Sequence, residues 1–289
     1  MSRGFVTLAV GSEKYYILAY NLLLSYRKAG GKEAFAIYCD RENHYTKEFN
    51  KVIILSSPYY SYLDKIQILN FPAYKYNIFI DADSLVYKNI DCLFCYFPFD
   101  GVKCFGSKLP IHSNDGWFNI KNLGNYSKTI KYLVNHHGGI IFYTNDYKTK
   151  NIYETSVEIA RNYSKYKFRM FENPADEPIM ALSMAIHDSC PIELENSIFL
   201  FLPMAKSIKS NISRKYIGFS LHNNDWNENA LLIHFQNYNT LRARYKTEIN
   251  RLNSMPFFYI GLLDCIYKIK DYVKDSIYNI KVFIYNIIH

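Results

Sequence analysis

The chain has 289 residues, of which 49% are hydrophobic and 21% are charged, so it is long and apolar enough to form one large or two modest globular domains. Its formal net charge of +8 suits an anionic partner, but the basic residues are scattered and accompany no recognised nucleic-acid motif, so we expect no nucleic acid. No apolar run reaches the roughly 20 residues that span a bilayer, and the N-terminus lacks a signal-peptide pattern, which leads us to expect a cytoplasmic protein.

The first eighty residues alternate short apolar strands with helical patterns. This alternation is typical of βαβ units and predicts an α/β fold with a mainly parallel, Rossmann-like mixed sheet flanked by helices. No Gly-x-Gly-x-x-Gly or Gly-Lys-Ser/Thr loop follows the first strand, which disfavours a dinucleotide fold and a P-loop. The expected elements are strands at 5–10, 35–39, 52–55 and 78–80, and helices from Tyr15 to Gly30 and from Leu63 to Leu69.

Two carboxylates follow the last of these strands, in Asp81-Ala82-Asp83. Residues two apart project to the same side of a strand, so both carboxylates meet at the carboxyl end of the sheet, where ligands of parallel sheets bind. Such a pair repels unless a cation lies between them, and a divalent ion with oxygen ligands is the natural occupant. The alternative is that the two residues only cap a turn or helix. Asp40 falls at another strand end of the same edge.

The segment from Leu63 to Phe94, LDKIQILNFPAYKYNIFIDADSLVYKNIDCLF, resembles the core of glycogenin-like, family-eight retaining glycosyltransferases, which have the GT-A fold. The shared features are a Lys before a helix (Lys65), an apolar strand, Asp-x-Asp, Ser-Leu-Val and Asn-Ile-Asp-x-Leu-Phe. The first strand, FVTLAVGSEKYY, also resembles the uridine-contacting strand of that family. The resemblance implies a set of residues that bind the donor nucleotide sugar: Thr7, Ala9, Tyr15, Asp40, Lys65, Asp81, Ala82, Gly138 and Gly139.

The segment from Pro98 to Asn135 is turn-rich and polar, and we interpret it as an insertion, either a loop that closes over a sugar or acceptor or a surface loop without a role. The histidines of His136-His137-Gly138-Gly139 are expected to be polar surface or substrate contacts before a strand at 140–143, rather than metal ligands. The family has Asn-Ser-Gly here, so the small residues are kept and the Asn is missing.

Asp176 and Glu177 begin a helical pattern that runs to Ile186. Acidic residues at a helix start can act only as caps and compensate the helix dipole. The resemblance implies instead that the acid at this position faces the reacting sugar and the acceptor hydroxyl. We therefore predict Asp176 and Glu177 as catalytic residues.

His234 ends the short apolar strand 231–235. A lone histidine there is commonly a core residue, but the resemblance implies that it is the third metal ligand, beside Asp81 and Asp83. The family continues with a Gly and then a Lys on the diphosphate, and neither is in place in Gln236-Asn237-Tyr238-Asn239-Thr240. We expect the phosphate contact to move to Arg242, Arg244 or Lys246.

The chain changes character after Ser254-Met255-Pro256, where a proline at a first turn signals a helix start. Apolar positions then recur every three to four residues, with lysines on the other faces, which predicts a basic amphipathic helix. We expect a GT-A catalytic domain at 1–250, with a nucleotide-binding part at 1–97 and an acceptor-side part at 98–250, and a helical tail at 251–289. Residues 256–289 are expected to contact the cytoplasmic membrane face or a second copy, or else to pack on the catalytic domain.

Together these patterns predict a metal-dependent glycosyltransferase that uses Mn²⁺ or Mg²⁺ and moves a sugar from a nucleotide sugar, by resemblance a UDP-sugar, to a glycan or glycolipid acceptor with retention. The alternatives are an inverting GT-A enzyme and a non-catalytic nucleotide-sugar-binding homologue. A nucleotidyltransferase is disfavoured because the chain lacks a glycine-rich N-terminal loop.

Overall fold

The computed structural model describes residues 2–97, 99–113, 115–169, 171–193, 199–201, 205–222, 225–236, 243–254, 260, 262–263, 265–273 and 276. Arg242 and residues 277–289 of the expected tail lie outside the described residues. The chain divides into two compact units. Unit 1 comprises Met1–Leu23, Lys32–Ala82 and Asp91–Asn196, and unit 2 comprises Leu24–Gly31, Asp83–Ile90 and Ser197–His289.

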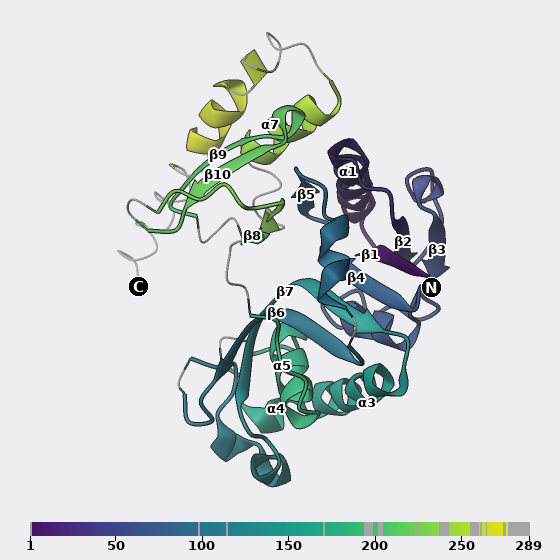
Figure 1. The fold of residues 1–289 in the computed structure, drawn as a ribbon, viewed down its shortest axis with the longest axis vertical. Coiled ribbons are helices and arrows are strands. Elements are labelled where there is room, and N and C mark those ends of the chain that lie inside the picture. Colours follow the sequence, from purple (N-terminus) through teal and green to yellow (C-terminus); the bar gives the residue numbers. More distant parts are fainter. Residues whose placement is uncertain are drawn as a thin grey trace, which may run out of the picture. The chain divides into compact units, whose positions relative to one another are not determined.

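Unit 1 is built on a six-stranded sheet with the order β3-β2-β1-β4-β7-β6 (Figure 1). Strands β3, β2, β1 and β4 run parallel, and β7 runs antiparallel to both of its neighbours. The prediction of an α/β fold with a mainly parallel mixed sheet flanked by helices is confirmed. The strands are β1 (Arg3–Ala9), β2 (Ala34–Cys39), β3 (Lys51–Ile54), β4 (Tyr76–Ile80), β6 (Val102–Leu109) and β7 (Leu133–Thr144).

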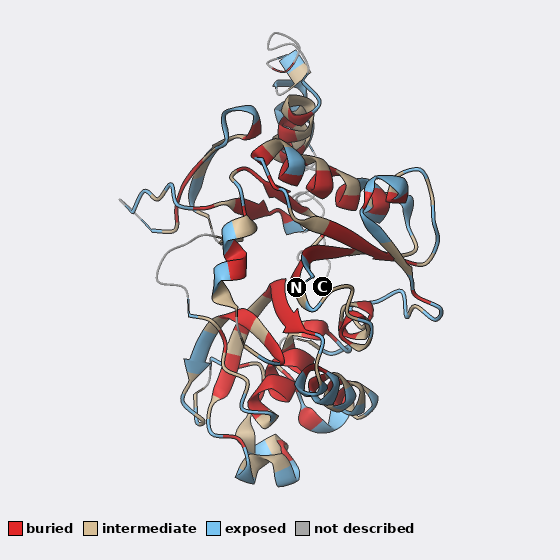
Figure 2. Cartoon of the chain, turned by 45° about the vertical axis from the view of Figure 1, so that its right-hand side comes forward, coloured by how far each residue is buried: buried red, intermediate tan, exposed pale blue. Residues whose placement is uncertain are grey.

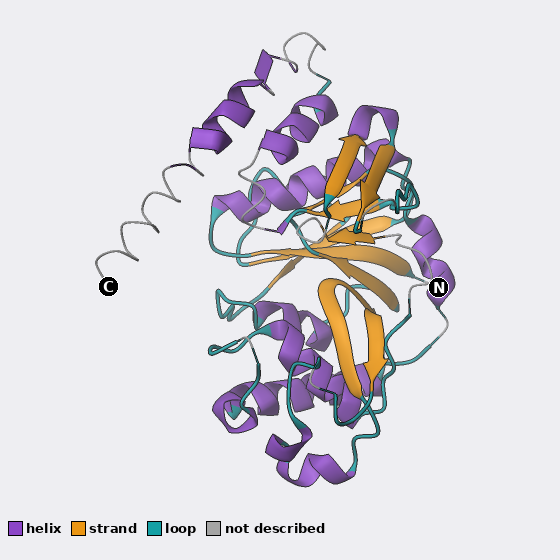
Figure 3. Ribbon diagram, turned by 90° about the vertical axis from the view of Figure 1, so that its left-hand side faces the viewer, coloured by secondary structure: helices purple, strands orange, loops and turns teal. Residues whose placement is uncertain are grey.

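One face of this sheet is covered by α3 (Tyr147–Arg161) and α5 (Asp176–Ile186), which pack on each other and on β6 and β7 (Figure 3). Side chains alternate along each strand, so Val6, Tyr38 and Phe79 reach this core from three neighbouring strands. Figure 2 shows how the buried residues follow the strands and the inner faces of the helices.

The opposite face of the sheet carries aromatic side chains. Phe5 lies 5.8 Å from Phe35 and 5.0 Å from Phe94, measured between ring centroids. Phe94 belongs to η3 (Asp91–Tyr96), a 3₁₀ segment that follows β5 (Ser84–Val86) in the chain. Helix α1 (Glu13–Ala29) connects β1 to β2.

Two expectations for the middle of the chain are wrong. The segment read as a turn-rich insertion contains β6, and His136 to Gly139 lie inside β7 rather than before a strand. The ladder between β6 and β7 has a bulge between Cys104 and Gly106. At Gly106 a Cβ atom would lie 2.1 Å from the Asn135 carbonyl oxygen, so only glycine permits this close approach.

Unit 2 contains two small sheets. In the first, β11 (Leu232–His234) pairs antiparallel with β5 (Ser84–Val86) and parallel with β8 (Phe199–Phe201). The second is the antiparallel pair β9 (Ser207–Asn211) and β10 (Tyr216–Ser220).

Helix α7 (Ala243–Leu252) is fixed to the β9–β10 pair by the buried carboxylate of Glu248. This carboxylate accepts hydrogen bonds from the Ile212 backbone N–H at 2.7 Å and from the Ser210 hydroxyl at 3.0 Å, and Arg251 lies 2.7 Å away. Burial raises the pKa of the Glu248 carboxyl and these three donors partly offset this effect, so we assign Glu248 a structural role.

The beginning of the expected tail is helical at 260, 262–263, 265–273 and 276. Ile260 is buried, and Asp271 accepts a hydrogen bond from the Ala243 backbone N–H at 2.6 Å. Leu262, Ile269 and other apolar residues of the same segment are exposed. Among the residues that the structure describes, no helix is both long and apolar enough to cross a membrane.

Candidate active site

Asp81 directly follows β4, in the middle of the large sheet. Its backbone N–H donates to the Gly139 carbonyl at 3.0 Å and so continues the β4–β7 ladder by one residue. On the other side of β4, the Thr7 hydroxyl donates to the Ile80 carbonyl at 2.8 Å. The backbone at the start of Asp81-Ala82-Asp83 is therefore held by both neighbouring strands.

Asp83 faces His234 within unit 2. The imidazole Nε2 atom of His234 lies 3.0 Å from the Asp83 carboxylate, and the Phe235 backbone N–H donates to the Asp83 carbonyl at 3.0 Å. Both side chains are largely shielded from solvent, with 8% of His234 and 15% of Asp83 exposed. Pairing of β11 with β5 sets this contact, because the register places His234 opposite Ser84.

Asp81 is separated from Asp83 by Ala82 alone, and one ligand atom each from Asp81, Asp83 and His234 lies within 4.8 Å of the others. Two carboxylate oxygens and one imidazole nitrogen form a donor set that suits a divalent cation such as Mn²⁺ or Mg²⁺. These residues therefore fit the metal site that the resemblance implies.

Lys65, in α2 (Asp64–Gln67), lies between two acidic residues of unit 1, Asp81 and Asp176. Its Nζ atom lies 3.0 Å from Asp81 and 2.8 Å from Asp176, and it donates to the Gly138 carbonyl at 3.3 Å. Burial opposes the charge, but Asp176 and Asp81 outweigh it and raise the pKa of Lys65 above its ordinary value. The residue is a fixed positive charge held by two carboxylates and one backbone carbonyl.

Glu177 lies over the glycine pair of β7. Its Oε1 atom accepts a hydrogen bond from the Gly138 backbone N–H at 2.9 Å and lies 3.7 Å from His137 Nδ1. A Cβ atom on Gly138 would lie 2.9 Å from an Asp176 carboxylate oxygen, so the missing side chain is what lets α5 approach β7. The structure thus brings Asp176, Glu177 and Gly138 together.

His136 is buried, which contradicts the expectation of a polar surface residue. Its Nε2 atom lies 3.2 Å from the Glu177 carbonyl, and burial lowers its pKa below the usual 6.5. A neutral imidazole that donates to this carbonyl would fix the first turn of α5. We interpret His136 as a residue that positions Glu177. The sequence alone does not indicate this role, because it depends on His136 being part of β7, where it meets the start of α5.

The residues expected to contact the nucleoside end up in two environments. Thr7, Ala9 and Ala82 are buried, and the Thr7 hydroxyl is bonded to the backbone. Tyr15 is exposed, while the Asp40 carboxylate lies beside Tyr16, Gly11 and Arg41, three residues whose role was not foreseen.

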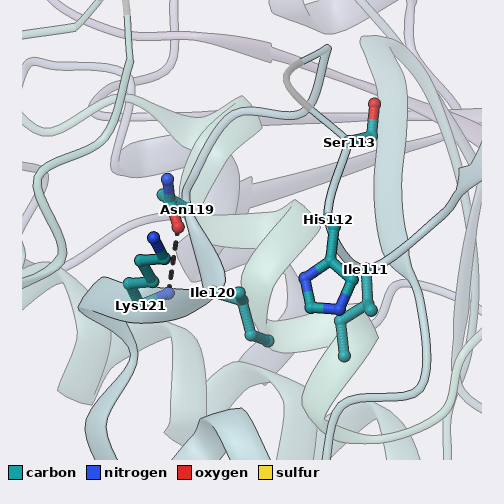
Figure 4. A pocket seen from close by; sticks show the side chains of 6 residues that line it. All are labelled: Ile111, His112, Ser113, Asn119, Ile120 and Lys121. Carbon is teal, nitrogen blue, oxygen red and sulfur yellow. Dashed lines mark hydrogen bonds between the residues drawn. The ribbon is translucent and has the colours of Figure 1, made fainter.

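Other expected contacts lie elsewhere in the chain. Lys246 lies 5.2 Å from the centre of the Tyr267 ring, and Arg244 belongs to α7. A pocket of about 240 Å³ lies in the segment after β6 and is lined by Ile111, His112, Ser113, Asn119, Ile120 and Lys121 (Figure 4). It contains none of the residues of the candidate active site.

No protein-family model matches this chain, and no curated protein matches its sequence. Among solved structures, the glycosyltransferase GlyE from Streptococcus pneumoniae TIGR4 is similar, with a TM-score of 0.45 and 10% sequence identity. The similar region covers 68% of this chain and 47% of GlyE, so the chain matches about half the length of that protein.

Proposed function

We propose that the protein is a metal-dependent glycosyltransferase that moves a sugar from a nucleotide sugar to a glycan or glycolipid acceptor. The observation that carries the proposal is the Asp81, Asp83 and His234 group, in which Asp81 follows β4 and lies 3.0 Å from Lys65. A site of two carboxylates, one imidazole and one buried lysine suits the transfer of a group away from a diphosphate, because negative charge develops on the leaving diphosphate as its bond to the sugar breaks.

Asp81, Asp83 and His234 would hold the ion, which when bound supplies Lewis-acid stabilisation to the departing diphosphate. Lys65 keeps the Asp81 and Asp176 carboxylates in place, with Nζ–O distances of 3.0 and 2.8 Å. Asp176 would accept hydrogen bonds from sugar hydroxyls on the side that faces away from Lys65. Gly138 leaves the room that this contact needs, because it carries no Cβ.

Glu177 would assist the acceptor hydroxyl. Its carboxylate is oriented by the Gly138 N–H, its carbonyl is bonded to His136, and its side chain remains 21% exposed. A carboxylate fixed in this way can accept a proton or orient a hydroxyl without first reorganising. A UDP-sugar donor and retention of the anomeric configuration are parts of the proposal that rest on the family resemblance.

The test is Mn²⁺-dependent hydrolysis or transfer of a UDP-sugar by purified protein. Asp83→Asn and His234→Ala should each lower the rate by about a hundredfold or more, since Lewis-acid stabilisation of this kind contributes several kcal/mol. EDTA should abolish the activity and added Mn²⁺ should restore it. Asp188→Asn is the matched control, because Asp188 is an exposed partner of Lys131 outside the site.

Full activity in EDTA, or in both substituted proteins, would refute the metal site. The anomeric configuration of the product, measured by NMR, decides between retention and inversion. A non-catalytic nucleotide-sugar-binding protein is the second candidate, favoured by the absence of the family's Gly and Lys after His234-Phe235. Calorimetric binding of UDP without transfer to any acceptor in a panel would establish that candidate instead.

A further inference from the structure

Four residues form a hydrogen-bonded cluster where β1 and β2 end. The Asp40 carboxylate accepts hydrogen bonds from the Tyr16 hydroxyl and, at 3.1 Å, from the Gly11 backbone N–H. Its second oxygen lies 2.9 Å from Arg41 Nη1, and Arg41 Nη2 donates to the Gly11 carbonyl at 2.9 Å. Three donors thus occupy the carboxylate, so Asp40 acts by orienting Arg41 and the turn at Gly11.

The planar guanidinium group of Arg41 is held in one orientation. Two bonds fix one edge of its guanidinium group, and its Cζ atom lies 5.2 Å from the centre of the Tyr16 ring. Half of the side chain, 51%, remains exposed. A guanidinium group that already lies over one aromatic ring has a second planar face, and that face can stack on another planar group.

Tyr60 approaches the same glycine. Its Cδ1 atom is 3.2 Å from the position that a Cβ atom on Gly11 would take, and 64% of the residue is exposed. Tyr60 has a φ of 53°, which is unfavourable for a residue with a side chain. The buried carboxylate of Asp64 holds this conformation, because it accepts hydrogen bonds from the Tyr59 and Ser61 backbone N–H groups at 2.7 and 3.1 Å. The fold therefore maintains a strained backbone that presents an aromatic ring to solvent.

The position of the Asp40–Arg41 cluster at the ends of β1 and β2 indicates which class of ligand it could bind. The chain leaves β1 for β2 on one side and reaches β4 on the other, and ligands of open α/β sheets bind where the strand order reverses in this way. Two strand spacings, roughly 10 Å, separate the ends of β2 and β4. A nucleoside diphosphate has the length to place its phosphates near Asp81 and its base near Arg41.

We propose that Arg41 and Tyr60 recognise the nucleobase of the donor, with the guanidinium plane of Arg41 stacked on the base and the Tyr60 ring beside it. This inference rests on the proposed function, since it assigns a subsite of the same donor. It also gives the chain base contacts beyond the residues that the family resemblance implies.

Calorimetry with UDP and with pyrophosphate, each in the presence of Mn²⁺, separates base binding from phosphate binding. Arg41→Lys keeps the charge and removes the plane, and Tyr60→Ala removes the ring. Each should weaken UDP binding on the order of tenfold and leave pyrophosphate binding unchanged, because one stacked base contributes about one factor of ten or more. Tyr60→Phe should bind UDP like the wild type. Arg161→Lys and Tyr147→Ala, both at exposed positions of α3, are the matched controls.

Several outcomes would overturn the inference. Wild-type UDP affinity in both Arg41→Lys and Tyr60→Ala would exclude stacking. Equal weakening of UDP and pyrophosphate would mean that Arg41 acts as a charge on the phosphates. If the wild type binds pyrophosphate as tightly as UDP, the base contributes nothing and only this inference fails. If the wild type binds neither ligand, the proposed function fails as well.

Discussion

Replacing Lys65 by methionine would test how far the candidate active site depends on a single buried charge. The substitution keeps the length of the side chain and removes the group that lies 3.0 Å from Asp81 and 2.8 Å from Asp176. Two carboxylates would then lose the cation that they share, at exposures of only 17% and 7%. We expect a folded but clearly destabilised protein.

The magnitude follows from the burial of the three groups. Removing one partner of a buried ion pair costs about 3–5 kcal/mol, and the residual exposure of Asp81 favours the lower end, about 3 kcal/mol. For a domain of this size, 1 kcal/mol lowers the melting temperature by roughly 2–4 °C, so Lys65→Met should melt about 6–12 °C below the wild type.

Urea unfolding at neutral pH measures the loss directly. Lys131→Met is the matched control, because Lys131 forms an ion pair of 2.7 Å with Asp188 in which both side chains are exposed. Exposed pairs contribute little, so this variant should unfold like the wild type. Adding Asp176→Asn to Lys65→Met should cost less than the sum of the two single changes, because the second change removes one of the two carboxylate charges that Lys65 had balanced.

Two results would refute this reasoning. Equal stability of Lys65→Met and the wild type would mean that water reaches and compensates both carboxylates. Strict additivity of Lys65→Met and Asp176→Asn would mean that the two residues do not interact energetically, despite their distance of 2.8 Å.

Three further predictions concern other parts of the chain. Burial lowers the pKa of His136, so as the pH falls the unfolded chain takes up this proton before the folded chain does, and the free energy of unfolding decreases below about pH 6.5. In urea unfolding, the free energy of unfolding of His136→Gln should therefore depend less on pH in this acid range. An unchanged dependence on pH would contradict this. Gly138→Ala should lower Mn²⁺-dependent turnover roughly tenfold to a hundredfold, because its Cβ would lie 2.9 Å from Asp176 and displace it; undiminished turnover would exclude that crowding. Deleting residues 255–289 should abolish flotation with anionic vesicles, since Leu262 and Ile269 expose apolar surface; equal flotation of both forms would show that this segment does not bind the membrane.

The parts of the site that could be predicted are those whose chemistry is local in the sequence. Asp81 and Asp83 follow an apolar strand at a spacing of two, and this pattern is enough to predict two neighbouring carboxylates directly after β4. Residues 82 and 83 form a turn in the structure, so the alternation of an extended strand is not what sets the directions of the two side chains. The role of His234 as third metal ligand could be predicted only from the family resemblance, because a histidine after an apolar run has no local signature of metal binding. The ladder between β11 and β5 then provides the contact with Asp83.

The parts that could not be predicted depend on pairing between distant segments. Gly138 and Gly139 resemble a strand break, since glycine has low strand propensity, yet the ladders to β4 and β6 keep them in an extended strand. His136 acquires its role only because β7 runs antiparallel beside β4 and meets α5. Arg41 looks like one basic residue among many until the ends of β1 and β2 are placed side by side.

The antiparallel strand β7 also has a consequence for how the protein reaches its native state. Strand β4 cannot complete its pairing until residues 140–144 exist, because Tyr76 pairs with Thr144 and Ile80 with Ile140. Strand β1 in turn waits for β4, as Arg3 pairs with Tyr76. Pairings of such high sequence separation form slowly, since loop closure costs entropy before contacts compensate it. During synthesis, Asp81 therefore gains its backbone contact with β7, and Lys65 its contacts with Gly138 and Asp176, only after β7 and α5 have emerged.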